Sequence, residues 1–387
     1  MSRLAIVSSN LLRFDKGFDY GERALTLARE VGDELDLAGA LDGLKMAAAY
    51  TGHFTRLQTT IPELERILRR RGELRYLQWA VFESSFEAMA RGHWDRATER
   101  IEQAVALSRR TGSRPIEPMF LAQLGWIHRS RGSYSRALEI GREAVSAAPD
   151  VGHPWMVAIA ECMLGWTLTE LFALDEALEH LEIGLAAAQR DGAGNWLVRC
   201  LGHLAHALWL KGDAERAREA ASQAEALLQE VTAPPGLAFL HGGHAYVATA
   251  EVWLGTGEPE RAERLVISLL EASKKAGWLE VHAAASLVVG RARMAVGDMD
   301  GALDRLTLAL EIADESGLPS IEWRTHVSAA QLRRAQGRAD LALDHDSRAS
   351  AVIDQTAAGI DGVKLRRAFR RGARAALGSG WESAHPG

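Results

Sequence analysis

Residues 211–228, KGDAERAREAASQAEALL, and residues 296–312, VGDMDGALDRLTLALEI, are built on one skeleton. In each stretch a glycine is followed five residues later by an alanine, and small or apolar residues then recur at helical steps. Apolar residues spaced three and four apart lie on one face of an α-helix. Both stretches are therefore predicted to be amphipathic helices that begin just after a glycine turn.

The position five residues after the turn glycine recurs along almost the whole chain, and we call this set of positions the column. Its members are 40 residues apart, except for one step of 45 residues. The five additional residues are predicted to lie around VTAPPG (231–236), where two prolines favour a longer loop. Phe172 replaces the turn glycine in one repeat. The column consists of Leu57, Ala97, Ala137, Ala177, Ala217, Ala262, Ala302 and Ala342.

Each repeat is predicted to contain two helices. A second small residue, such as Gly125, Gly165 or Gly290, stands seven residues before the turn position. Small residues on both sides of the turn allow the paired helices to approach closely. Glycine and proline gather between the repeats, where helices are expected to end. No stretch shows strand alternation bounded by hairpin turns, so the predicted fold class is all-α.

Residues 124–145, LGWIHRSRGSYSRALEIGREAV, resemble a tetratricopeptide repeat (TPR), with Leu-Gly, an aromatic residue and then Gly-x-Tyr-x-x-Ala. The usual repeat has about 34 residues. The 40-residue form here is similar to the TPR-like arrays of MalT-type regulators, large LuxR-type activators and cyclase-linked bacterial regulators. The resemblance implies a right-handed superhelical solenoid of about nine repeats over residues 1–360. Turns are expected near residues 18, 52, 92, 132, 172, 212, 257, 297 and 337.

The two ends depart from the regular pattern. Residues 361–378 carry one apolar and one basic stripe, and are predicted to form a helix that caps the last repeat. Gly372 lies on the apolar stripe and weakens the helix there. Pro62 is predicted to interrupt the second helix of its repeat. Residues 379–387 are predicted to be a disordered tail.

Composition excludes several classes of protein. The net charge of −6 disfavours direct nucleic-acid binding. Cys162 and Cys200 stand in neither disulfide-framework nor zinc spacing, which predicts reduced thiols. No apolar run reaches the roughly 18 residues of a membrane-spanning helix, and the N-terminus does not resemble a signal peptide. We expect a soluble, cytoplasmic protein without membrane contact.

The sequence contains no pattern typical of an enzyme. It has no phosphate-binding GxxxxGK[ST], no HExxH and no Gly-x-Ser-x-Gly elbow. HGGH (241–244) and the pair His203 and His206 come nearest to a metal motif, but their repeat columns do not match. We therefore expect no catalytic site, no metal and no cofactor.

The most informative positions lie on the first helix of each repeat, which by the same resemblance lines the concave groove. Aromatic residues there suit a peptide or an apolar ligand, and arginines suit a carboxylate or a phosphate. Burial in the core remains the alternative for the aromatic residues, and a solvated face remains the alternative for the arginines. The predicted groove residues are Trp79, Phe82, Phe86, Trp126, Arg129, Trp166, Arg199, His206, Trp209, His244, Glu251, Arg291, Arg324 and Arg334.

These features predict a non-catalytic regulatory binding module in bacterial signalling or transcription regulation. It would recognise a peptide, a protein or a small effector in the groove. The alternative is a detached or truncated sensor region of a MalT-type activator or of a cyclase-linked ATPase, since those relatives carry further domains. A scaffold that forms a homodimer is a third reading that the sequence leaves open.

Overall fold

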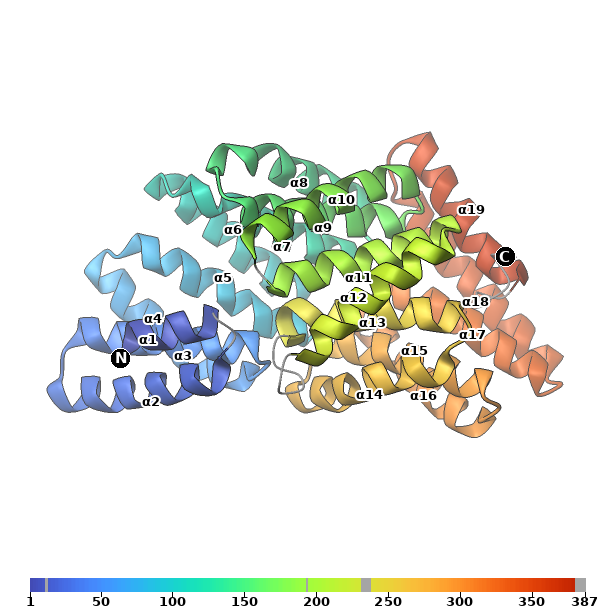
Figure 1. The fold of residues 1–387 in the computed structure, drawn as a ribbon, viewed down its shortest axis with the longest axis horizontal. Coiled ribbons are helices and arrows are strands. Elements are labelled where there is room, and N and C mark those ends of the chain that lie inside the picture. The colour runs from blue at the N-terminus through green and yellow to red at the C-terminus, as the bar shows by residue number, and fades with distance from the viewer. Residues whose placement is uncertain (11–12, 193, 231–237, 380–387) are drawn as a thin grey trace.

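The computed structural model describes residues 1–10, 13–192, 194–230 and 238–379. Within these ranges the regular structure is helical and no strand is present, which confirms the all-α prediction. The first and last helices, α1 and α19, lie toward opposite ends of the long axis (Figure 1). Two short 3-10 helices, η1 (Arg114–Ile116) and η2 (Pro149–Val151), precede α7 and α9. The α-helices are α1 (Ser2–Asn10), α2 (Phe14–Val31), α3 (Glu34–Tyr50), α4 (Phe54–Arg71), α5 (Leu74–Ala90), α6 (Trp94–Thr111), α7 (Glu117–Ser130), α8 (Tyr134–Ala147), α9 (Pro154–Glu170), α10 (Leu174–Asp191), α11 (Gly194–Lys211), α12 (Ala214–Glu230), α13 (Ala238–Gly255), α14 (Pro259–Ala276), α15 (Leu279–Ala295), α16 (Met299–Ser316), α17 (Pro319–Ala335), α18 (Ala339–Ala358) and α19 (Val363–Ser379).

Glycines with left-handed backbone angles separate the helices. Gly92 and Gly132 occupy two of the predicted turns, with φ of 70° and 73°. Gly112, between two repeats, has φ of 66°. A residue with a Cβ atom pays about 1–2 kcal/mol for this conformation, so glycine is favoured. The turns between repeats form a second glycine column, which the 40-residue spacing of the first column does not reveal: residues 32, 72, 112, 152, 192, 277 and 317.

The paired helices pack closely through small residues, as predicted. The column alanines Ala97 and Ala177 are fully buried. At Gly165 a Cβ atom would lie 3.1 Å from the carbonyl oxygen of Ala177 and 2.6 Å from the Leu181 side chain. Glycine at this position therefore allows α9 and α10 to touch.

The two helices of a repeat differ in burial. In α9 nearly every residue from Met156 to Glu170 is buried, whereas α6 buries one stripe that includes Ala97, Ile101 and Ala104. We call the odd-numbered helices α3 to α17 the inner helices and the even-numbered helices α2 to α18 the outer helices. Several charged side chains on the inner helices, among them Arg129, Glu170 and Arg291, are consequently enclosed by protein.

The array closes on itself, so that early repeats contact late ones. Trp126 of α7 stacks on Trp278, which precedes α15, with ring centroids 5.9 Å apart and planes at 22°. Phe54 of α4 meets the same indole edge-on at 5.2 Å. Trp94 Nε1 donates a hydrogen bond to the carbonyl oxygen of Ser316, at 2.6 Å. These contacts join α4, α6 and α7 to the α14–α17 part of the chain.

The predicted cap, α19, contacts more than the last repeat. The Phe369 ring lies 6.0 Å from the ring of Tyr134 in α8. At Gly372 a Cβ atom would lie 2.2 Å from Cγ of Phe172. Among the residues that the structure describes, Phe172 is also the one non-glycine residue with a positive φ, 55°. Phe172, which replaces a turn glycine, therefore packs directly against Gly372 of the cap helix.

Two local predictions were wrong. The turn expected near residue 18 does not exist, because α2 runs without a break over Phe14–Val31 and packs against α1. Pro62 does not interrupt its helix, since α4 continues over Phe54–Arg71. The loop insertion predicted at 231–236 and most of the predicted tail, 380–387, lie outside the described residues. In the part of the chain that the structure describes, no helix has the length and apolar character needed to cross a membrane.

Candidate functional site

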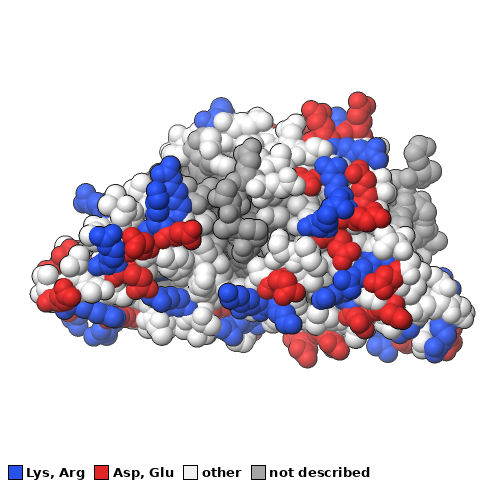
Figure 2. All heavy atoms as spheres, turned by 60° about the horizontal axis from the view of Figure 1, so that its bottom comes forward, with Lys and Arg blue, Asp and Glu red and all other residues white. Residues whose placement is uncertain are grey.

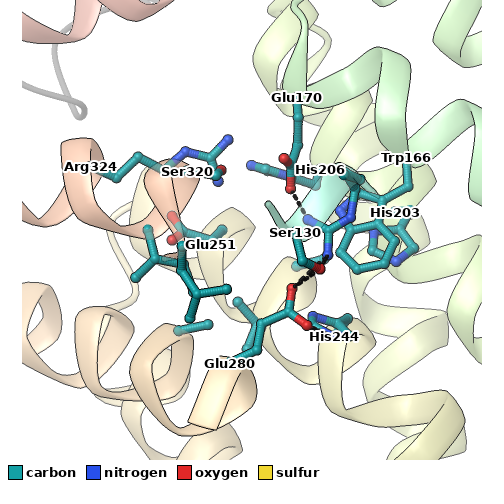
Figure 3. Close-up of a pocket in the computed structure, with 16 residues that line it drawn as sticks. Ser130, Trp166, Glu170, His203, His206, His244, Glu251, Glu280, Ser320 and Arg324 are labelled. Carbon is teal, nitrogen blue, oxygen red and sulfur yellow. Dashed lines mark hydrogen bonds and ion pairs between the residues drawn. The ribbon is translucent and has the colours of Figure 1, made fainter. Parts of the chain in front are cut away.

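A small polar cavity lies where six inner helices meet (Figure 3). Its volume is about 60 Å³, room for roughly four water molecules if each needs about 15 Å³. Buried polar groups are costly unless they are paired, so a cavity with this lining requires a reason. The charged and polar residues of its wall are Arg129, Ser130, Glu170, His203, His206, His244, Glu251, Glu280, Ser320 and Arg324.

Glu280, in the first turn of α15, is the centre of the contacts around this cavity. Its Oε1 accepts hydrogen bonds from Arg129 Nη2 at 2.6 Å and from Ser130 Oγ at 2.8 Å. Its Oε2 accepts one from Trp126 Nε1 at 3.1 Å and lies 3.6 Å from His244 Nε2. The three donors sit on α7, so one buried carboxylate ties early repeats to late ones.

The surroundings of Glu280 favour its ionised form. Burial alone would raise its pKa, but the neighbouring His244 and Arg129 and the Ser130 hydroxyl together hold the pKa of Glu280 well below its ordinary value. A carboxylate that accepts several hydrogen bonds and faces a cation is stabilised in its charged form. Glu280 is therefore negatively charged at neutral pH despite its burial.

Arg129 extends this cluster to α9. Its Nη1 donates to Glu170 Oε1 at 2.6 Å, and the Tyr134 hydroxyl donates to the other oxygen of Glu170 at 2.7 Å. The guanidinium carbon lies 3.5 Å from the ring centroid of Trp166, a cation–π contact. Arg129 thus links Glu170 and Glu280 and covers the aromatic wall of the cavity.

The opposite wall carries a second set of charges. Glu251 of α13 forms a buried ion pair with Arg291 of α15. Burial opposes ionisation, yet Arg291, His206 and Arg324 hold the pKa of Glu251 below its ordinary value. Arg324 extends from α17 toward the space between Glu251, His206 and Glu170 (Figure 3). Its half-buried guanidinium is the cation on the α17 side of the cavity.

Three buried histidines complete the wall, and each is neutral at pH 7. Burial lowers the pKa of His206 to about 4. It also lowers the pKa values of His203 and His244. The Nε2 atoms of His203 and His206 are buried and have no hydrogen-bond partner within the described ranges, whereas Nε2 of His244 faces Glu280. The cavity therefore contains polar atoms that the protein itself does not satisfy.

Arg199, behind the tryptophans, is the most unusual charge. Its Nε and Nη2 atoms are buried, and neither has a hydrogen-bond partner among the residues described. The guanidinium carbon lies 4.6 Å from the Trp126 ring and 5.2 Å from the Trp166 ring. Burial lowers the pKa of Arg199 to about 10, which leaves it charged at pH 7.

The sequence-predicted groove residues fall into three sets. Those that line the cavity are Arg129, Trp166, His206, His244, Glu251 and Arg324. Those that contact the lining residues are Trp126, Arg199 and Arg291. The structure does not bring the remaining five to this cavity: Trp79, Phe82 and Phe86 form an aromatic cluster, Trp209 packs against Gly255, and Arg334 is exposed and pairs with Asp346.

Several lining residues were not predicted, above all Glu280, Glu170 and Ser130. Most of the predicted groove residues lie beyond the first turn of their helices, whereas Glu280 and Ser320 lie in the first turns of α15 and α17. These two stand 40 residues apart, one repeat length, and that shared register was a usable signal. Within the described chain no group of three or more His, Cys, Asp or Glu side chains is arranged to hold a metal ion.

Comparison with known proteins identifies the architecture. No protein-family model matches the sequence, and no curated protein matches it significantly. A Rap protein solved with competence and sporulation factor is 13% identical, with 92% of this chain and 99% of that chain covered and a TM-score of 0.63. The chain is a TPR-like repeat array.

Two further Rap structures resemble this array. The Rap conjugation gene regulator of plasmid pLS20, in complex with the Phr* peptide, is 13% identical over 91% of this chain and 96% of that one, with a TM-score of 0.58. The apo form of RapI is 10% identical over 76% and 99%, with a TM-score of 0.50. At such low identity the likeness establishes a shared fold alone.

Proposed function

We propose that the chain is a non-catalytic regulatory module that recognises a peptide between its inner helices, in bacterial signalling or transcription regulation. The observation that supports this most directly is the buried cluster in which Glu280 joins Trp126, Arg129 and Ser130 across the array. Two similar Rap structures contain competence and sporulation factor or the Phr* peptide, so a peptide is the best-supported class of ligand.

The chemistry of the cluster suits a reversible contact. Replacing a buried ion pair by apolar residues is often neutral or stabilising, so such pairs are weak evidence of a purely structural role. A peptide carries main-chain N–H and C=O groups that can take over the hydrogen bonds of Arg129, Ser130 and Glu280. Separation of α7 from α15 would also expose Trp126 and Trp166, which suit apolar peptide side chains.

Such an exchange would transmit a signal through shape. The Glu280 contacts join α7 to α15, so a ligand that displaces them changes the position of the early repeats relative to the late ones. A ligand shifts a conformational equilibrium only by its difference in affinity for the two states. We therefore propose that the peptide binds an opened array more tightly than the closed one.

A peptide-capture experiment tests this function. The purified protein is immobilised and incubated with a random pentapeptide pool, and retained peptides are identified by mass spectrometry. We expect a restricted set of retained sequences, at least tenfold weaker retention by Trp126→Ala, and no change for the control Arg334→Ala, whose side chain is exposed. Addition of a retained peptide should change the amide hydrogen–deuterium exchange rates of both α7 and α15 relative to the free protein. Retention of no peptide above the level of a blank resin would refute the proposal.

A further inference from the structure

A surface groove on the early repeats is far larger than the central cavity. It is lined by residues of α4, α5 and α6, of which α5 packs against both neighbours (Figure 1). Its volume is about 790 Å³, and sites that bind ligands commonly have about 300–1,000 Å³. Among the residues that the structure describes, the groove and the central cavity have no lining residue in common. The groove is therefore a separate feature with room for a short peptide segment.

Arginines outnumber carboxylates in the lining of this groove. Glu65 of α4 forms ion pairs with both Arg69 and Arg100. Arg96 Nη1 lies 3.6 Å from Oε2 of the buried Glu87 of α5. Two carboxylates thus face four arginines, which leaves two positive charges in excess on a chain with a net charge of −6. The lining residues counted are Arg66, Arg69, Arg96 and Arg100 against Glu65 and Glu87.

Two of these arginines are accessible to a partner. Arg66 is exposed, and no ion pair or hydrogen bond joins its side chain to another residue within the described ranges. Arg96 is 61% exposed, and its neighbour Glu87 is already paired with Arg91 at 2.7 Å. Arg66 belongs to α4 and Arg96 to α6, so two different helices supply the accessible guanidinium groups. A cleft with an excess of one charge attracts counter-ions and charged ligands.

The same groove also offers an apolar surface and a main-chain acceptor. Leu57, Ile61 and the exposed Pro62 contribute to its lining. Because proline has no N–H, the main-chain carbonyl of Gln58 lacks the hydrogen bond that residue 62 would donate in a regular helix. Gln58 also lines the groove. A protein segment supplies N–H donors, apolar side chains and carboxylates together, whereas a sugar–phosphate backbone supplies chiefly negative charge.

We infer that this groove binds an acidic segment of a partner protein, with Arg66 and Arg96 as the donors to its carboxylates. The inference goes beyond the proposed function, because it concerns the outer helices and a second partner. A guanidinium binds a carboxylate through two parallel N–H···O bonds. Exposed ion pairs are individually weak, so apolar contact with Pro62 has to accompany them. A segment that combines acidic and apolar residues matches the groove.

The test uses two peptide pools that differ only in the sign of their charge. Fluorescein-labelled decapeptides of the acidic pool contain Asp, Glu, Val, Leu, Gly and Ser in random order, and in the basic pool Lys and Arg replace Asp and Glu. Binding to the purified full chain is measured by fluorescence anisotropy. We expect at least tenfold tighter binding of the acidic pool. Salt at about 0.3 M should weaken this binding, because it screens exposed charges.

The variants neutralise matched pairs of exposed arginines. Arg66→Gln combined with Arg96→Gln should weaken binding of the acidic pool at least tenfold. The control is Arg142→Gln combined with Arg216→Gln, which removes two exposed arginines of α8 and α12 and therefore the same net charge. It should bind as the wild type does. Circular dichroism and the urea midpoint establish that each variant is folded, and Arg66→Gln alone serves as the reporter if the double variant is not.

The outcomes separate this inference from the proposed function. Equal binding of the two pools, or unchanged binding by the folded groove variant, would overturn the acidic-segment site and leave recognition at the central cluster standing. A labelled DNA strand that binds through Arg66 and Arg96, when the acidic pool does not, would also overturn it. Folded Trp126→Ala should bind the acidic pool as the wild type does. Weaker binding by that variant would place the acidic peptides at the central cluster and contradict the inference.

Discussion

The inner and outer helices of this array use the same charged residues in opposite ways. On the outer helices, Arg142 pairs with Glu176 at 3.1 Å, with side-chain exposures of 54% and 41%. Such pairs lie among interspersed positive and negative side chains on the surface (Figure 2). On the inner helices, Arg129 pairs with Glu280 at 2.6 Å, with exposures of 3% and 4%.

The contrast shows that position in the fold, not residue type, decides what a charge contributes. Exposed ion pairs are typically worth about 0–1 kcal/mol, because water and salt already solvate both partners. A buried pair gains more from its partner and loses more when one side is removed. The inner charges therefore constrain the molecule, whereas the outer charges chiefly keep its surface solvated.

The largest effect is expected at Glu280. Replacement by alanine leaves Arg129 with one carboxylate partner and removes the acceptor for Trp126 and Ser130. We expect Glu280→Ala to lower the free energy of unfolding by about 3–5 kcal/mol, measured by urea denaturation. Glu280→Gln, which keeps an acceptor oxygen, should lose less. A loss below about 1 kcal/mol for Glu280→Ala, the upper end for an exposed pair, would remove the contrast between inner and outer charges.

The second effect depends on pH and concerns His206. Its pKa falls from 6.5 to about 4 on folding, so the unfolded chain binds the proton more tightly. The stability that depends on neutral His206 is complete above about pH 6.5 and is lost as pH falls toward 4. At pH 5 this one group should cost about 2 kcal/mol relative to pH 7.5. The charged groups that face it are Glu170, Glu251, Arg291 and Arg324.

The measurement is urea unfolding of wild type and His206→Gln at pH 7.5 and pH 5. We expect the wild type to lose about 2 kcal/mol more than the variant between the two values, since one burial-shifted histidine is absent from the variant. Equal losses in both proteins would show that His206 is solvated or already protonated in the folded state.

The third effect tests the seam between Phe172 and Gly372. A Cβ at residue 372 would collide with the Phe172 ring, which costs about 1–3 kcal/mol, while alanine improves helix propensity by up to about 1 kcal/mol. Gly372→Ala should therefore destabilise the wild type by about 1 kcal/mol net. In a Phe172→Ala background the same change should stabilise by up to about 1 kcal/mol. Thermal unfolding measures the stability change in both backgrounds. If Gly372→Ala changes stability in the same direction in both, the contact between Phe172 and Gly372 is refuted.

The smallest effect is expected on the outer surface. Glu176→Ala removes the exposed partner of Arg142, and we expect a change of about 0.5 kcal/mol or less. Half-molar salt should reduce even this difference, because it screens exposed charges. A loss as large as that of Glu280→Ala in the same urea assay would mean that outer pairs also hold the repeats together.

For the site, the repeat register and the resemblance to TPR arrays together predicted that Arg129, Trp166, His206, His244 and Glu251 share one inner surface. The structure places all five in the cavity wall, and their role in binding stays a prediction. Other predicted groove residues do not reach the cavity, because the same position in different repeats packs against different neighbours. Phe82 and Phe86 pack against each other, and Arg334 reaches the surface.

The amino-acid sequence by itself determined the helices, their pairing and the direction of their faces. Those features follow from local rules: a glycine at each left-handed turn, alanine where helices touch, and apolar residues at helical spacing. Only the tertiary structure decided that Trp126 meets Trp278 and that Glu280 joins Arg129. Such contacts depend on a small rotation between successive repeats that accumulates over many of them. The total rotation cannot be read from any single stretch of residues.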